Sequence, residues 1–489
     1  MAAIPVIVYL PIVAVIFYAI LGFLFGGYAE RKTYCMVIAT HQVMGLRYSR
    51  IYEIILVSIA VSSLGTGLLV AAGAIPTVDA YAFLPGAGWF TLLGSFIFGF
   101  GMMLGQGCMV GMLWKSGTGY VVNWLELLGL AVGSIIFAFP IFSWLNLSYW
   151  WKASVAGNIP NGAASNYIPN VLAGIPSTVA AGIMGVLFFA VIIFVALILR
   201  KRRIESEGKK PLDRKTLLNS PYFIGFLFSL AMVASFIFAA GHSFNYLGVT
   251  TPVALFSQYI LSPFSVFLGG SAVGTNWYQT ITIISDFSFF ILMIIAGSTI
   301  FSMARGTFKV RLPGGTASKV GDLSIGFVGG MIIAIGARIA QGCSVGGFWS
   351  GLAGLSIFGL VFTVGIILGS VAGYYAYVFL SSALARKRRA GNPSVQPLTG
   401  SRSKYRQILE QYLFSLIFGL ILVSIGLESL YGNSHYITKV ASSLIVQETD
   451  VMVIIGILVM VAGFIITTIQ YLKLSKAPAV ESTPATHSA

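Results

Sequence analysis

The sequence predicts an all-α, polytopic membrane protein with about nine continuous transmembrane helices, four broken or re-entrant segments and two inverted repeats. Composition is the first reason, because 57% of the 489 residues are hydrophobic and only 9% are charged. The apolar residues gather in runs of about 20, the length that a helix needs to cross a hydrocarbon core of ~30 Å. The second reason is a glycine- and cysteine-containing phrase that occurs twice.

Nine apolar runs are long enough to be continuous spans, and four further apolar segments are interrupted by glycine, proline or polar residues. The predicted spans are 4–27, 51–74, 122–145, 177–199, 222–241, 279–303, 352–380, 409–431 and 449–472. The interrupted segments are 28–50, 89–119, 250–276 and 323–350. The first run is too long for a signal-peptide core and no basic residue precedes it, so we expect it to be retained.

The net charge of +15 reports topology rather than a nucleic-acid partner. Of the 29 Lys and Arg residues, 25 fall in five blocks between apolar runs, at 31–50, 200–215, 305–319, 386–406 and 473–476. The positive-inside rule places such blocks in the cytoplasm, together with the C-terminus. The four exceptions are Lys115, Lys152, Arg338 and Lys439.

The phrase GQGCMVGMLW at 105–114 returns 235 positions later as AQGCSVGGFW at 340–349. The same shift superposes several predicted spans, and the basic blocks require the two copies to cross in opposite directions, as in many secondary transporters. The predicted organisation is a first half at 1–199, a basic cytoplasmic linker at 200–220, a second half at 221–431, an extra transmembrane helix at 432–472 and a disordered tail at 473–489.

The glycines of the phrase predict broken helices, which are tolerated in a membrane only when they are buried in protein or line a cavity. A break exposes backbone N–H groups at the start of the next half-helix, where an anion is favoured. The candidate transport path contains Cys108, Cys343, Gly107, Gly111, Gly342 and Gly346. Thiols and amides without a fixed array of charges suit a sulfur-rich anion. Helix packing is the alternative for either phrase alone.

Other polar residues at membrane depth are weaker candidates. Gln106 and Gln341 precede the Gly-Cys pairs, where they either donate to an anion or bind freed carbonyls. Arg338 and Lys115 are candidates for attracting substrate, because ionisable groups inside a membrane are often functional. The alternative is that Lys115 extends to the cytoplasmic interface and Arg338 binds helix carbonyl oxygens. Asp286 is a candidate for proton coupling or for a solvated outer end, and His41 and His242 are read as interfacial.

Several classes of function find no support in the sequence. Three cysteines without disulfide or metal-site spacing argue against a disulfide framework and a zinc site. A P-loop is absent, so no ATP-driven transport is expected from this chain alone. A membrane sulfurtransferase or redox protein that uses its cysteines covalently remains an alternative, although no His lies near any of them in sequence.

The segments GFGMMLGQGCMVGML and GARIAQGCSVGGFWSG resemble the paired signatures of the YeeE/YedE family, and TYCMVIA resembles the segment around its third cysteine. The resemblance covers roughly residues 10–380. It implies an inner-membrane transporter for thiosulfate, not an enzyme, without cofactor or metal, whose relay uses Cys35, Cys108 and Cys343. It also implies a possible cytoplasmic TusA-like sulfur carrier. Other members are linked to selenium metabolism, so a selenium compound is the alternative cargo.

Overall fold

The computed structural model describes residues 4–46, 48–75, 86–137, 167–172, 174–207, 222–239, 286–312, 319–391, 404–432 and 442–475. Within these ranges the chain is almost entirely helical, and the β-type pairs are two isolated bridges outside any strand. This bears out the predicted all-α fold. The chain forms two compact units, residues 1–298 with 311–398 and residues 299–310 with 399–489.

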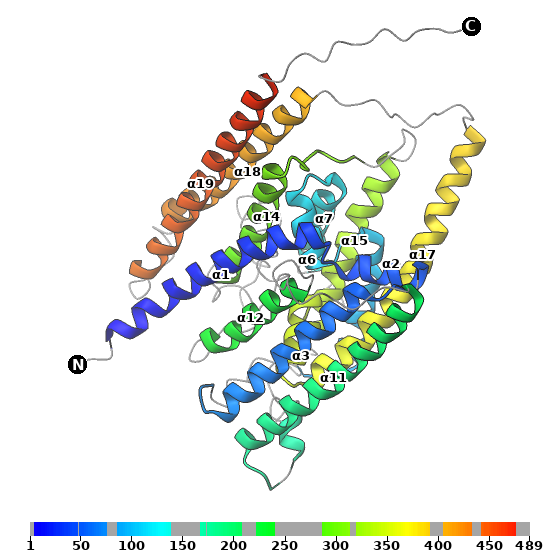
Figure 1. Ribbon diagram of the computed structural model, residues 1–489, viewed down its shortest axis with the longest axis vertical. Helices are drawn as coiled ribbons and strands as arrows, with labels where there is room; N and C mark the ends of the chain where they lie inside the picture. The colour runs from blue at the N-terminus through cyan, green and yellow to red at the C-terminus, as the bar shows by residue number, and fades with distance from the viewer. Residues whose placement is uncertain are drawn as a thin grey trace. The chain divides into compact units, whose positions relative to one another are not determined.

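The first unit holds most of the helices (Figure 1). Their bounds are α1 Ile4–Lys32, α2 Met36–Leu46, α3 Arg50–Ala71, α5 Trp89–Gly105, α6 Met109–Gly117, α7 Val121–Ile136, the 3₁₀ turn η2 Ile168–Val171, α11 Ser177–Glu207, α12 Tyr222–Ala239, α15 Lys319–Ala340, the π-helix η5 Ser344–Ser350, α16 Gly351–Ala353 and α17 Ile357–Gly391. Helix α14, Asp286–Ala304, begins in this unit and ends in the second.

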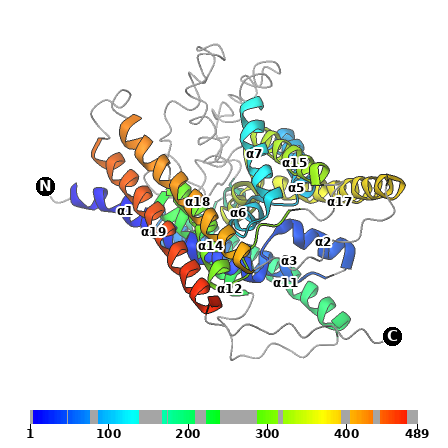
Figure 2. The same cartoon turned by 90° about the horizontal axis from the view of Figure 1, so that it is seen from above.

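The second unit is a pair of long helices, α18 at Lys404–Gly432 and α19 at Ser442–Ser475, which lie side by side in Figures 1 and 2. They are antiparallel and approach closely through small residues, since Gly463 lies against Ser415 and Gly456 against Gly419. A short approach of this kind is usual between membrane helices, where small side chains let the backbones pack tightly.

In the described ranges a helix overlaps each of the nine predicted continuous spans, and six helices there are long and apolar enough to cross a membrane. Two of those six, Trp89–Gly117 and Gly321–Ala340, were expected to be interrupted segments. In both, a long regular helix precedes the break, because the glycines that interrupt it sit near the end of the apolar run. The predicted segment 250–276 lies outside the described residues, as does His242.

The basic linkers also begin later than the sequence suggests. Helix α11 continues through Arg200–Arg203 to Glu207, and α17 continues to Gly391. Lys, Arg and Glu are strong helix formers, so a helix that leaves the apolar layer has no local reason to stop at its first charged residue.

The two helices that precede the repeated breaks pack directly against each other. Gly94 of α5 lies against Ala340 of α15, and Gly105 lies against Gly329. The residue number falls along α15 as it rises along α5, so the helices are antiparallel. The shift of 235 maps Gly94 onto Gly329 and Gly105 onto Ala340. The Gly94–Ala340 contact is therefore equivalent to the Gly105–Gly329 contact, with the two helices exchanged. This packing agrees with the inverted repeat, which for the whole halves stays a prediction.

The helices that follow the breaks complete this arrangement (Figure 2). Helix α7 packs parallel to α15, and α17 packs parallel to α5. The close contacts are Gly129–Phe327 and Gly133–Met331 between α7 and α15, and Gly369–Phe96 and Gly373–Phe100 between α17 and α5. Each helix before a break is therefore packed against the helix that follows the other break.

Candidate functional site

The first phrase forms a helix break at residues 106–108. Helix α5 ends at Gly105, its C-cap Gln106 has a left-handed backbone with φ 65°, and Cys108 in extended conformation is the N-cap of α6. The buried Cys108 Sγ accepts a hydrogen bond from the Gly111 N–H at 3.3 Å. A side chain that accepts from the third residue of the following helix is an N-cap, so the thiol occupies the position where a helix start favours negative charge.

The second phrase repeats this local geometry. Helix α15 ends at Ala340, the following Gln341 is also left-handed with φ 57°, and Cys343 is the N-cap of the π-helix η5. The Cys343 Sγ accepts from the Gly346 N–H at 3.2 Å. The predicted helix breaks are confirmed at both positions, and the recurrent cysteine serves as a helix cap in each.

Cys35 lies in the short connection between α1 and α2, and the structure brings it to the first break. Its Sγ is 3.7 Å from the Cys108 Sγ, and both side chains are buried. The Met36 N–H also donates to the Cys108 Sγ, at 3.4 Å. A side chain at Gly111 would collide with the Cys35 sulfur, so glycine is required there for the two thiols to meet.

Tyr34, next to Cys35, is held by the tryptophans of both phrases. The Trp114 indole donates to the Tyr34 carbonyl oxygen at 2.9 Å. The Trp349 ring lies 6.1 Å from the Tyr34 ring, and its Nε1–H donates to Ser58 Oγ at 3.0 Å. The Tyr34 hydroxyl is 3.3 Å from the same Ser58 Oγ. The connection that carries Cys35 is thus fixed between the two broken segments.

The surroundings of Cys343 are more apolar. Gly342 packs against Phe358 and Gly347 against Phe362, both from α17. The adjacent Ser344 is fully buried, and its Oγ has no hydrogen-bond partner in the described part of the chain. In the described part of the chain the thiol–thiol contact joins Cys35 and Cys108, and Cys343 is not part of this pair.

Of the charged and amide candidates, Lys115 has a hydrogen-bond partner for its side chain at the first break. Lys115 Nζ donates at 2.5 Å to the Gln106 carbonyl oxygen, which the break leaves without a helical donor. Lys115 therefore acts on the first break, a role that sequence alone left open. Arg338 is buried in the last turn of α15, and the Gln341 N–H donates to its carbonyl oxygen.

The remaining predicted candidates lie away from the thiol pair or outside the described side chains. Asp286 begins α14, and its side chain is outside the described part of the structure. His41 packs edge-on against the rings of Tyr374 and Tyr377, 5.2 and 5.5 Å away.

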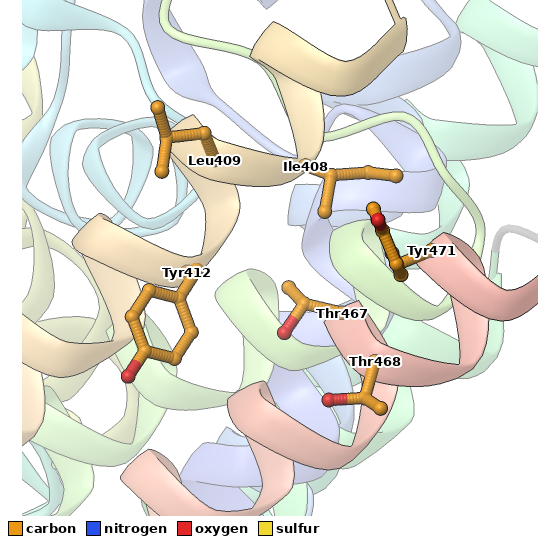
Figure 3. Close-up of a pocket in the computed structure, with 6 residues that line it drawn as sticks. All are labelled: Ile408, Leu409, Tyr412, Thr467, Thr468 and Tyr471. Carbon is orange, nitrogen blue, oxygen red and sulfur yellow. The ribbon is translucent and has the colours of Figure 1, made fainter. Parts of the chain in front are cut away.

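Figure 3 shows a pocket between α18 and α19 in the second unit. It is lined by Ile408, Leu409, Tyr412, Thr467, Thr468 and Tyr471. Leu409 and Tyr471 are half exposed, as lipid-facing side chains of a helix pair are, and none of the predicted site residues takes part.

Sequence reasoning missed two polar residues at the first break, Asn123 and Glu126 of α7. The Asn123 side-chain amide donates to Glu126 Oε2 at 2.6 Å, and both residues are buried. The signal was present, because Glu126 is a carboxylate within the predicted span 122–145 and ionisable residues inside spans are functional candidates by default.

Comparison with known proteins covers the region that contains this site. A family described as sulphur transport matches residues 31–372, which include all three cysteines and both breaks. The chain is 27% identical over 372 residues to the thiosulfate transporter TsuA of Escherichia coli (strain K12), covering 73% of this chain and 94% of the relative. It is 24% identical over 356 residues to the thiosulfate transporter TsuA of Spirochaeta thermophila, covering 72% and 95%.

Proposed function

Because the chain belongs to the sulphur-transport (YeeE/YedE) family, we propose that it imports thiosulfate through a path that includes Cys35, Cys108 and Cys343. The family and the names of its relatives indicate a multi-pass membrane transporter and not an enzyme. The observation that carries the proposal is the buried pair of thiols, 3.7 Å apart at the start of α6.

The chemistry of this pair suits a sulfur oxyanion. Thiols are weak donors and polarisable acceptors, so they can bind both the oxygens and the terminal sulfur of thiosulfate without the strength of a fixed positive charge. The N–H groups of Met36 and Gly111 already point at the Cys108 sulfur. An anion that displaces this sulfur would meet preformed donors at a helix start. Gln106, Gln341 and Arg338 flank the breaks along the same path.

Import requires an energy source. Thiosulfate carries two negative charges, and moving each against an inside-negative potential costs about 2.3 kcal/mol per 100 mV, or roughly 4.6 kcal/mol in total. The inward direction is proposed from Cys35, which follows the basic pair Arg31–Lys32 and would be the last thiol before the cytoplasm. The inner (plasma) membrane location, the cytoplasmic C-terminus and the TusA-like carrier stay predictions.

The test is uptake of thiosulfate labelled in its outer sulfur by cells that lack other sulfur importers. Wild type is compared with Ala and Ser replacements of Cys35, Cys108 and Cys343, each quantified in the membrane fraction. We expect the Ala variants to lose uptake. The Ser variants should keep the helix caps and recover only part of the rate, because an oxygen can accept the N–H groups but is less polarisable.

Two results would contradict the proposal. If wild type takes up no thiosulfate, the substrate is wrong, and selenium oxyanions become the next cargo to assay. If all three Ala variants import as fast as wild type, the thiols are packing residues. A covalent persulfide detected during uptake on any of the three cysteines would instead favour sulfurtransferase chemistry.

A further inference from the structure

A carboxylate lies against the first helix break from the side of α7. Cβ atoms added at Gly105 and Gly107 would collide with the two carboxylate oxygens of Glu126. The Gly107 N–H faces this carboxylate, and Asn123 donates to its Oε2. The other oxygen, Oε1, is buried without a hydrogen-bond partner in the described part of the chain. Two glycines of the repeated phrase therefore make room for an acid.

Among the residues that the structure describes, the corresponding contacts at the second break are apolar. The positions that correspond to Asn123 and Glu126 are Phe358 and Val361, by the same shift of 235 that superposes the phrases. Phe358 packs on Gly342 where the first break has a carboxamide and a carboxylate. Helix breaking alone thus needs no acid, so the acid at the first break calls for a separate explanation.

Burial and nearby groups both act on Glu126. Among the described residues, Lys115 of α6 and the Cys35 thiol act on it electrostatically. Helix α5 contains no ionisable residue. Gly330 is the residue of α15 that packs on the Glu126 backbone, and Asp322 and Arg338 lie eight residues before and after it, about 12 Å along the helix. A charge bound at the thiol pair therefore acts on Glu126 in addition to its burial and to Lys115.

Resting on the proposed function, we propose that Glu126 carries the coupling proton of this transporter. A dianion at Cys35 and Cys108 would lie beside Gly107, whose N–H faces the carboxylate, and two like charges so close repel strongly where water is scarce. The anion is therefore held when Glu126 is protonated. Once the anion leaves toward the cytoplasm, this repulsion ends and the proton can leave to the same side. One proton enters with each anion at this site, and no electron moves.

The test uses the full-length protein in proteoliposomes. Counterflow exchange of labelled against unlabelled thiosulfate needs no net proton movement, whereas accumulation driven by an acidic exterior does. In wild type we expect thiosulfate to bring protons inside and a gradient of one pH unit to raise accumulation by up to about tenfold per coupled proton. In Glu126→Gln, which is neutral like the protonated acid, we expect counterflow to persist, with gradient-driven accumulation and proton entry lost.

Two further variants keep the result interpretable. Glu126→Asp retains an acid and should keep proton-driven accumulation. Glu410→Gln on α18 is the control, because it makes the same chemical change in the second unit. The glutamine oxygen can still accept the hydrogen bond from the Val310 N–H, so this variant should behave like wild type.

The proposal is overturned if Glu126→Gln accumulates thiosulfate in response to pH as wild type does. It is also overturned if folded Glu126→Gln loses counterflow, since the acid is then needed for translocation itself. Wild type that exchanges thiosulfate without proton entry overturns this inference alone. Wild type without any exchange overturns the proposed function and this inference with it.

Discussion

Trp114 and Trp349 hold the same place in the two phrases, 235 residues apart, and both contact Tyr34. One binds its carbonyl oxygen and the other packs against its ring. The repeated phrase thus fixes the segment that carries the third cysteine, in addition to forming the two breaks. This relationship explains why a cysteine without a counterpart in the second half lies at the first break.

Removing the hydrogen bond of Trp349 should destabilise the protein. Its indole donates to the buried Ser58 Oγ, so Trp349→Phe loses a buried hydrogen bond and leaves a small cavity, at an expected cost of about 1–3 kcal/mol. Thermal unfolding in detergent can be followed by the reaction of the buried cysteines with a fluorogenic maleimide. Trp89→Phe is the control, since Trp89 is 58% exposed. Equal stability of the two variants would contradict this role.

A methyl group at Gly111 should separate the two thiols. The added carbon would collide with the Cys35 sulfur, so Gly111→Ala should lower thiosulfate uptake roughly tenfold or more, the scale on which misplacing a group by about 1 Å acts. Helix α6 itself should tolerate alanine. Gly88→Ala is the matched control, because a Cβ there meets open space. Normal uptake by Gly111→Ala at normal membrane abundance would refute the requirement for close thiols.

The distance between Cys35 and Cys108 predicts which disulfide can form. The sulfurs must close from 3.7 Å to about 2.05 Å, a shift within the reach of side-chain rotation. Diamide, which takes up the two hydrogen atoms of a thiol pair, should yield a Cys35–Cys108 linked peptide in mass spectrometry. The Cys343→Ser variant should give the same product. A dominant link that involves Cys343 would contradict the geometry.

The ion pair between Glu53 of α3 and Arg203 of α11 should matter for stability and not for substrate selection. Arg203 donates to both carboxylate oxygens at 2.8 and 2.9 Å, and Ser49 and Tyr222 add further donors. Glu53→Gln leaves the partly exposed Arg203 guanidinium without its counter-charge and weakens its hydrogen bonds to a buried partner, at an expected cost of about 1.5–3 kcal/mol.

The double variant Glu53→Gln/Arg203→Met should recover much of that loss in the same thermal assay, while the KM for thiosulfate stays at the wild-type value. A changed KM in the single variant would show that the ion pair shapes the path.

The sequence predicts the membrane class, the long apolar helices and the two breaks, because apolar length and glycine placement act locally. It does not predict that Cys35 lies beside Cys108, since a contact across 73 residues depends on how α1 and α2 pack against α6. It also missed Glu126. The rule that selects intramembrane acids pointed first to Asp286, and only packing reveals that the glycines of the phrase accommodate the other acid.

The symmetric contact between α5 and α15 has an evolutionary consequence. An interface in which each contact recurs with its partners exchanged would serve equally between two identical half-length chains, as in a two-fold homodimer. Fusing such chains by gene duplication leaves that interface intact and frees each copy to diverge elsewhere. The divergence is visible beside the breaks, where one copy has Asn123 and Glu126 and the other has Phe358 and Val361. In a homodimer of one half-length chain, the residues beside the two breaks would have to be identical.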